Sequence, residues 1–162
     1  MEKLNSFDKI LPLRGIGKVY PVDKTLRIID ANQNRAKEGL RVCEEVVRFI
    51  LNDTKLTGEF RTSRHKISKI ISSLPVDRKE LLKHRDTEKD IGKDISERTN
   101  RAGYQDIFSA NIQRVKESLR VLEEFSSLVS KDARQRFKRL RFKVYNLEKK
   151  TIEKFSTLCN NR

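Results

Sequence analysis

The sequence is poor in the residues that cross-link a small protein or bind a metal. Among 162 residues there are only two cysteines and two histidines. Cys43 and Cys159 lie far apart without C-x-x-C spacing, and His65 and His84 are isolated from one another, so neither pair has the spacing of a metal site. A chain of this length can fold without a disulfide or a metal. We expect reduced cysteines, with Cys43 buried in an apolar helical face.

Long apolar segments and familiar catalytic motifs are also absent. No segment approaches the roughly 18 apolar residues of a membrane span, and the first residues, MEKLNSFDKILPLRG, contain no signal-peptide core. We therefore expect a soluble, cytoplasmic protein without a membrane partner. The sequence offers no Ser-His-Asp arrangement, and the segment Gly15-Ile16-Gly17-Lys18 does not have Walker spacing.

Positive charge, in contrast, is abundant. The chain has 37 basic and 23 acidic side chains and a net charge of +14, which favours anionic partners such as nucleic acid or a phosphorylated metabolite. Residues 133–162 hold ten Lys or Arg and two Glu, and 10 − 2 = +8 is more than half of the net charge. We interpret this segment as a solvated helix face, with a binding patch as the alternative.

The sequence contains an internal repeat. The segment ANQNRAKEGLRVCEEVVRFI, Ala31 to Ile50, aligns without gaps with ANIQRVKESLRVLEEFSSLV, Ala110 to Val129, and ten of the twenty positions are identical. After a two-residue shift, FRTSRHKISKI from Phe60 aligns with FKRLRFKVYNL from Phe137. The repeat is therefore two helices long, which indicates a duplicated helical hairpin.

Apolar residues recur at three- and four-residue steps in all four predicted helices, which is the pattern of a core face. In the first helix of each copy they are Ala36, Leu40, Cys43, Val47 and Ile50, and Val115, Leu119, Leu122, Ser126 and Val129. In the second helices they are Leu56, Phe60, Ile67, Ile70 and Leu74, and Phe137, Leu140, Val144, Leu147 and Thr151.

Two hairpins that each have one apolar side can bury those sides against each other. We therefore predict an all-α fold, an antiparallel bundle of four main helices with an internal pseudo-two-fold axis. A short extra helix is expected around Leu81 and Leu82. The predicted divisions are an amino-terminal extension (1–26), one helical domain (27–156, with repeat 1 at 27–75, a connector at 76–106 and repeat 2 at 107–156) and a tail (157–162).

Helix ends have their own sequence signals. Asp30 and Ser109 precede the two aligned segments, so both are predicted N-caps, and Gln33 would complete a capping box with Asp30. The second helices follow turns marked by polar residues that can cap them. These are Asn52, Asp53 and Thr54 in the first copy and Ser130 and Asp132 in the second.

A ladder of polar residues recurs beside each core face. The first copy has Asn32, Arg35, Glu38, Arg41 and Glu45, and the second has Asn111, Arg114, Glu117, Arg120 and Glu124. The Glu and Arg residues have the spacing of helix-stabilising ion pairs, yet neither this nor helix propensity explains the asparagines. If the ladders converge at one end of the bundle, Arg would bind phosphate, and Glu would bind a metal or accept from a heterocycle amine.

The connector adds a second polar cluster around a glycine. It contains Arg85, Asp86 and Asp90 close to Gly92. Carboxylates beside a glycine turn in such a basic protein suit Mg²⁺ held against phosphate oxygens, whereas a polar surface loop is the structural alternative.

These motifs resemble those of a known family, the second, non-ribokinase-like type of hydroxymethylpyrimidine-phosphate kinase, commonly fused to the amino terminus of thiamine-phosphate synthase. The resemblance lies in RIIDANQNRAKEGLRVCEEVVRF from Arg27, SRHKI from Ser63, HRDTEKDIGKDI from His84 and SANIQRVKESLRVLEEF from Ser109. It continues in the tail RFKVYNLEK from Arg141. The synthase half is not in this sequence, so we expect a stand-alone version of the domain.

The resemblance implies ATP-dependent phosphorylation of 4-amino-5-hydroxymethyl-2-methylpyrimidine phosphate to the diphosphate for thiamine assembly, with ATP and Mg²⁺ as cofactors. It implies phosphate-binding or catalytic roles for Arg35, Arg41, Arg85, Asp86, Arg114 and Arg120. The remaining implied roles are pyrimidine binding by Asn32, Glu38, Asn111 and Glu117, and metal binding by Glu45, Asp90 and Glu124.

Two other functions stay open at this stage. A non-catalytic accessory domain of thiamine-phosphate synthase would explain the fusion, and a basic helical module that binds nucleic acid would explain the charge. The absence of a known recognition motif argues against nucleic acid. Association with a synthase and self-association are both left open.

Overall fold

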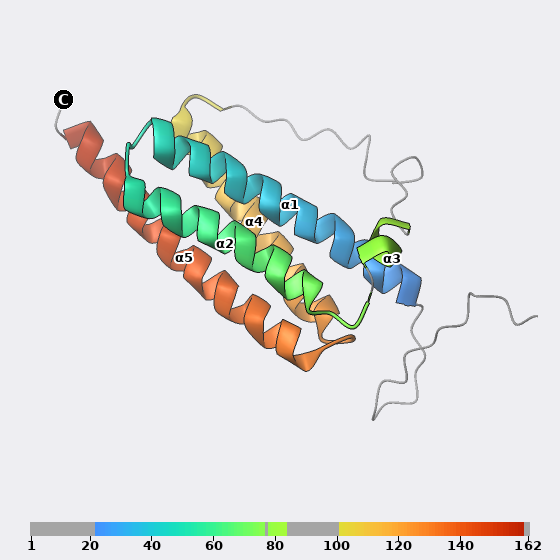
Figure 1. The fold of residues 1–162 in the computed structure, drawn as a ribbon. Helices are drawn as coiled ribbons and strands as arrows, with labels where there is room; N and C mark the ends of the chain where they lie inside the picture. The colour runs from blue at the N-terminus through green and yellow to red at the C-terminus, as the bar shows by residue number, and fades with distance from the viewer. Residues whose placement is uncertain (1–21, 77, 84–100, 161–162) are drawn as a thin grey trace, which may run out of the picture.

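The structure, a computed structural model, describes residues 22–76, 78–83 and 101–160. These residues form five helices and no strand (Figure 1). The helices are α1 (Val22–Phe49), α2 (Thr54–Ser72), α3 (Arg78–Lys83), α4 (Tyr104–Ser126) and α5 (Lys131–Asn160). The fold is all-α as predicted, and α3 is the short helix expected around Leu81. Arg85, Asp86 and Asp90 lie outside the described residues.

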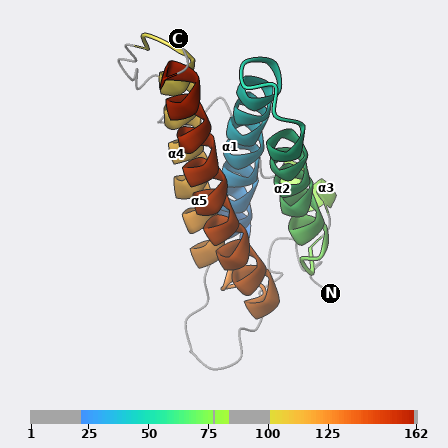
Figure 2. The same cartoon turned by 90° about the vertical axis from the view of Figure 1, so that its left-hand side faces the viewer.

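The four long helices form an antiparallel bundle. The hairpin of α1 and α2 packs against that of α4 and α5, so that α1 contacts α4 and α2 contacts α5. Each helix runs opposite to both of its neighbours, and the order around the ring is α1, α2, α5, α4 (Figures 1 and 2). Each helix thus pairs with its equivalent in the other repeat, as duplication predicts. The α1–α4 and α2–α5 contacts lie on opposite sides of the ring.

The predicted apolar faces form the core. In all four long helices the predicted positions are buried, except Ile50 and Val129 near the ends of the first helices, which pack against the core while partly exposed. The aromatic centre joins three helices, because the Phe108 ring lies 6.0 Å from the rings of both Phe60 and Phe155. Since Phe60 and Phe155 lie on α2 and α5, this cluster ties the second helices to α4.

The first helices of both repeats begin earlier than predicted. Asp30 and Ser109 lie inside α1 and α4, so both N-cap predictions are wrong. Gln33 does donate to Asp30 at 3.0 Å, but within the helix rather than at its end. The extra turns are favoured because they bury apolar side chains, among them Ile29 in α1 and Phe108 in α4. Tertiary burial outweighed the local capping signal.

The structure bears out the predicted burial of Cys43. Cys43 is fully buried, and burial, with the charge of Glu148, raises the pKa of its thiol well above the usual range. A thiol in this state is a poor nucleophile. Within the parts of the chain that the structure describes, no helix is long and apolar enough to cross a membrane.

One of the predicted candidates in each turn caps the second helix. Asp53 accepts a hydrogen bond from the Leu56 backbone N–H at 2.9 Å, and Ser130 accepts one from the Ala133 N–H at 3.2 Å. Asp53 also pairs with Lys154 of α5 at 3.2 Å. The backbone hydrogen bond, followed by the Lys154 interactions, holds the pKa of Asp53 below its usual value despite the opposing effect of burial.

We expect Asp53→Ala to lower the free energy of unfolding at neutral pH by about 1 kcal/mol, the usual cost of losing an N-cap. Because the folded pKa is lowered, the carboxylate stabilises the protein above its unfolded pKa of about 3.9 and loses this effect as the pH falls through the folded value. Urea unfolding of both proteins at pH 7 and pH 3 should show the difference shrinking in acid. A difference independent of pH would contradict a charged cap.

Candidate functional site

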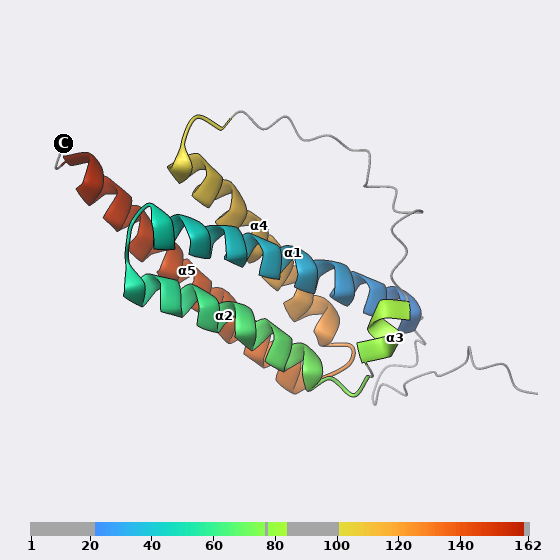
Figure 3. The ribbon, with the colours of Figure 1, turned by 45° about the horizontal axis from the view of Figure 1, so that its top comes forward.

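The ladders lie on α1 and α4, which contact each other and cross (Figure 3). Because the two helices are antiparallel, the ladders run in opposite directions. Glu45 lies near the end of α1 and Glu124 near the end of α4, at opposite ends of the bundle. The expectation that the ladders converge at one end is therefore wrong. A single metal ion cannot contact both glutamates.

The middle of each ladder lies at the crossing of the two helices. At Gly39 an added Cβ would lie 3.0 Å from the Asn111 carbonyl oxygen, so the backbones of α1 and α4 approach each other closely here. Arg35 is one turn before Gly39 on the same side of α1, and Arg114 is one turn after Asn111 on α4. The structure thus brings the two arginines to one region of the surface, and both are exposed.

We call this region the central ladder site, defined by Arg35, Glu38, Arg114 and Glu117. All four side chains are exposed. Glu117 accepts a hydrogen bond from Gln113 at 2.7 Å. Two forked cations beside two carboxylates, open to solvent, can bind a phosphate and accept from a ring amine.

The ladder asparagines have internal partners. Asn32 and Asn111 are each 7% exposed. Their amide nitrogens donate to the carbonyls of Ile28 at 2.9 Å and Ile107 at 2.8 Å, one turn earlier in the same helix. These bonds explain polar residues at a close helix contact without a ligand. Pyrimidine binding by the asparagines stays a prediction.

The last arginine and glutamate of each ladder form an ion pair, which we call the outer rung of that ladder. Arg41 Nη2 lies 2.7 Å from Glu45 Oε1, and Arg120 Nη2 lies 2.7 Å from Glu124 Oε1. Among the described residues, Glu45 Oε1 has no hydrogen bond of good geometry although it is buried. Its contact with Arg41 is therefore mainly electrostatic, and the atom retains capacity to accept from a further donor.

Sequence reasoning missed the carboxylate one position before each outer rung. Glu44 is fully buried, and three arginines surround it. Arg61 Nε donates to Oε1 at 3.0 Å and Arg64 Nε to Oε2 at 3.3 Å, both from α2, while Arg41 Nη1 lies 3.8 Å away. This cluster fastens α1 to α2 and also orients Arg41.

The second repeat contains the equivalent cluster. Glu123, 2% exposed, accepts from Arg141 Nε and Nη2 at 2.9 and 2.8 Å and from Arg120 Nη1 at 3.0 Å. Arg141 Nη1 also donates to the Tyr145 hydroxyl at 2.8 Å. Burial lowers the pKa of Arg141, but the hydrogen bonds to Glu123 and Tyr145 outweigh it and raise the pKa above its usual value.

The alignment of the repeats contains the signal for these clusters. Glu44 aligns with Glu123, and Arg64 aligns with Arg141. Glu44 also follows the core residue Cys43 directly and lies one turn after Leu40, so helical spacing puts it at the edge of the buried face. A carboxylate at the edge of the core in both repeats needs a cationic side chain on the helix that packs against it in both repeats.

The structure does not test the metal prediction. Among the residues it describes, no three His, Cys, Asp or Glu side chains are grouped closely enough to hold a metal. Asp90 and Asp86 are not among those residues. Metal binding by Glu45, Asp90 and Glu124 therefore stays a prediction.

The arrangement defines a class of protein. It is an all-α bundle made from a duplicated hairpin, with a buried Glu–Arg cluster inside each hairpin and a polar surface where the first helices cross. Comparison with known proteins gives the family: residues 27–150 match the sequence model of the ThiD2 family. The chain belongs to that family.

Two relatives of this chain are both named thiamine-phosphate synthase. The chain is 40% identical over 124 residues to thiamine-phosphate synthase of Nostoc punctiforme. The aligned segment covers 75% of this chain and 34% of that protein. The chain is 36% identical over 122 residues to thiamine-phosphate synthase of Rhodopirellula baltica, covering 74% and 32%. The chain thus spans about a third of the length of these relatives. No solved structure matches it.

Proposed function

We propose that this protein transfers a phosphoryl group from ATP to 4-amino-5-hydroxymethyl-2-methylpyrimidine phosphate and makes the diphosphate for thiamine biosynthesis. The observation that carries the proposal is the family match, which extends over both ladders and the connector between them. The relatives named thiamine-phosphate synthase support a place in the same biosynthesis.

The chemistry suits a site built from cations. An oxygen of the substrate phosphate attacks the γ-phosphorus of ATP, the bond from that phosphorus to the β-bridging oxygen breaks, and ADP leaves. The attacking oxygen is already anionic, so no strong base is required. Catalysis then depends on alignment of two anions and neutralisation of their charge. Mg²⁺ enters bound to ATP as part of that substrate.

The central ladder site provides these functions in the proposal. Arg35 and Arg114 bind phosphate oxygens from the two sides of the helix crossing. Glu38 and Glu117 accept from the pyrimidine amino group. Arg85 and Asp86 of the connector, which lie outside the described residues, keep their proposed phosphate-binding or catalytic roles. Arg41 and Arg120 act through their glutamates, because each already pairs with two carboxylates.

We expect the purified protein, mixed with Mg-ATP and the pyrimidine monophosphate, to form ADP and pyrimidine diphosphate in equal amounts, measured by mass spectrometry. Arg35→Gln should lower kcat/KM by about 100-fold, as loss of a donor to developing charge usually does, with the melting temperature unchanged. Arg134→Gln on α5 is the matched control, since it removes the same charge from another exposed helix position and should keep full activity.

The test separates the remaining interpretations. Equal activity in the Arg35 and Arg134 variants would remove the central ladder site from the mechanism. A folded protein that forms no product would contradict the kinase proposal. In that case an accessory role beside a synthase is favoured, because the chain matches only about a third of each synthase relative.

A further inference from the structure

A groove of about 590 Å³ lies between α2 and α5, on the side of the ring opposite the α1–α4 crossing. Basic residues dominate its lining. They are Arg61, Lys66 and Lys69 of α2 and Arg136, Arg139 and Lys143 of α5. None of the described residues that line the groove is acidic. We call it the basic groove.

Among the described residues of the groove lining, only the two arginines at its edges have carboxylate partners that the structure shows. Arg61 pairs with Glu44 at 3.0 Å, and Arg136 pairs with Asp132 at 3.3 Å. Lys66, Lys69, Arg139 and Lys143 form no ion pair within the described part of the chain. Like charges held near each other across a groove repel, and an anion between them would remove that repulsion.

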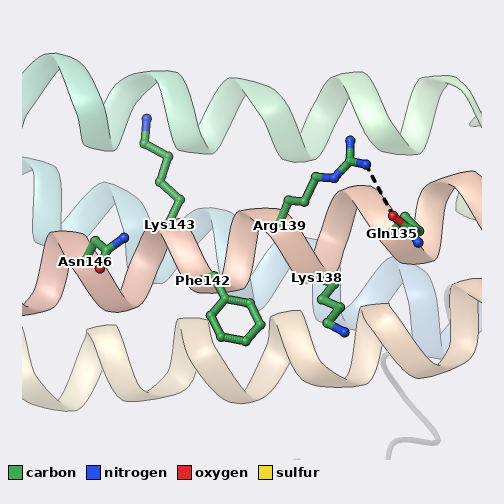
Figure 4. Close-up of a pocket in the computed structure, with 6 residues that line it drawn as sticks. All are labelled: Gln135, Lys138, Arg139, Phe142, Lys143 and Asn146. Carbon is green, nitrogen blue, oxygen red and sulfur yellow. Dashed lines mark hydrogen bonds between the residues drawn. The ribbon is translucent and has the colours of Figure 1, made fainter.

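The side chains of α5 extend toward this groove. Figure 4 shows a neighbouring shallow hollow on α5, where Arg139 and Lys143 point toward α2 while Lys138 and Phe142 point toward α4. Arg139 Nη2 donates a hydrogen bond to Gln135 Oε1 at 3.3 Å. Two cations of α5 therefore face the cations of α2, although the helices are far apart in sequence.

The other half of the same helix pair is neutralised. Toward the start of α2, Lys150 lies 3.4 Å from Glu59 and Lys154 lies 3.2 Å from Asp53. The hollow at this end is lined by both signs of charge, including Glu153. The contrast shows that unpaired cations are not a general property of this contact. They are concentrated in one half.

We propose that the basic groove binds a linear chain of phosphates, of the chemical class found in tripolyphosphate and in the triphosphate of a nucleotide. Arg61 and Lys69 of α2 are eight positions apart, about 12 Å along the helix, and a chain of three phosphates is shorter than this. Lysine and arginine together supply point charges and forked donors to phosphate oxygens. This site goes beyond the proposed kinase reaction.

The neutralised half limits the length of the ligand. A nucleic-acid backbone that continued along the helix pair would meet as many carboxylates as lysines there, Asp53, Glu59 and Glu153 beside Lys55, Lys150 and Lys154, so phosphates in that half gain no net attraction. A short polyphosphate fits within the basic half alone. The structure therefore favours a small ligand over a nucleic acid.

The experiment is isothermal titration calorimetry of the full chain with sodium tripolyphosphate, without Mg²⁺, at about 150 mM salt, where distant charges are screened. Lys66→Gln with Lys143→Gln removes one cation from each helix. It should weaken tripolyphosphate binding at least about tenfold, because each hydrogen bond from a charged group contributes substantially to the binding free energy. The control pair, Lys55→Gln with Lys149→Gln, removes the same charge outside the basic groove and should change the affinity less than about twofold.

Further titrations distinguish the sources of the phosphate chain. ATP binding that is weakened by the groove pair in the same way would identify a nucleotide, whereas tripolyphosphate binding alone would identify free polyphosphate. Equal weakening by the two pairs, or no binding by the folded wild type, would overturn the proposal. So would a single-stranded oligonucleotide that binds and is not displaced by tripolyphosphate. The pyrimidine substrate is absent, so failure of the kinase reaction does not affect this test.

Discussion

Arg141→Met is expected to lower the free energy of unfolding by about 3 kcal/mol, because it leaves a buried carboxylate without its main partner. Arg141 donates twice to Oε2 of Glu123, and the Glu123 side chain is only 3% exposed. After the substitution Arg120, one turn away on the same helix, is the one partner of Glu123 left among the described residues. Methionine keeps much of the apolar packing, so the loss reports the charge. Urea unfolding with a constant m-value measures it.

The first repeat provides the matched control. Arg64→Met should cost less, about 1 to 2 kcal/mol, because Glu44 keeps Arg61 across the helix pair and the lost contacts are longer, 3.3 Å. The double variant Glu123→Gln with Arg141→Met should be more stable than Arg141→Met alone, since no unpaired charge is left. A double variant less stable than the single one would show that packing of Arg141, not the ion pair, carries the effect.

Gly39→Ala should destabilise the protein by about 2 kcal/mol, although alanine is the better helix former. The new Cβ would lie 2.7 Å from Val115 Cγ2 and 3.0 Å from the Asn111 carbonyl oxygen. The valine side chain can move, but the backbone oxygen cannot move without separating α1 from α4. The cost of overpacking therefore exceeds the gain in helix propensity. Thermal and urea unfolding measure the net change.

Gly58→Ala is the control for Gly39→Ala. Gly58 also lies inside a helix, but nothing is within 4 Å of its added Cβ. This substitution should raise the free energy of unfolding by about 0.5 to 1 kcal/mol through helix propensity and reduced freedom of the unfolded chain. If both substitutions stabilised the protein equally, the α1–α4 contact would be looser than the structure shows.

Much of the fold could be predicted because its signals are local and repeated. Spacing alone identified a line of buried residues in each of the four long helices, and two copies of one hairpin left few ways to bury their apolar sides. The predicted starts of α1 and α4 were wrong. Asp30 and Ser109 are good N-cap residues, but the burial of Ile29 and Phe108 in longer helices stabilises the fold more than a cap at those positions would.

The candidate site could be predicted less well. Both ladders were recognised, but their direction in space was not, and this decides which residues can meet. Glu45 and Glu124 are separated by the antiparallel crossing, whereas Arg35 and Arg114 are brought to it. Glu44 and Glu123 were missed because only the second glutamate of each repeated Glu-Glu pair, Glu45 or Glu124, was included in the ladders.

The sequence by itself determined the class of fold, the duplication, the core faces and the family resemblance, since all of these depend on residue type and spacing along one chain. Only the tertiary structure decided which of two adjacent glutamates is buried, where the ladders cross and which cations face each other between α2 and α5. The physical reason is that burial and Coulomb energy depend on distances between helices. Those distances are set by packing, which no single helix encodes.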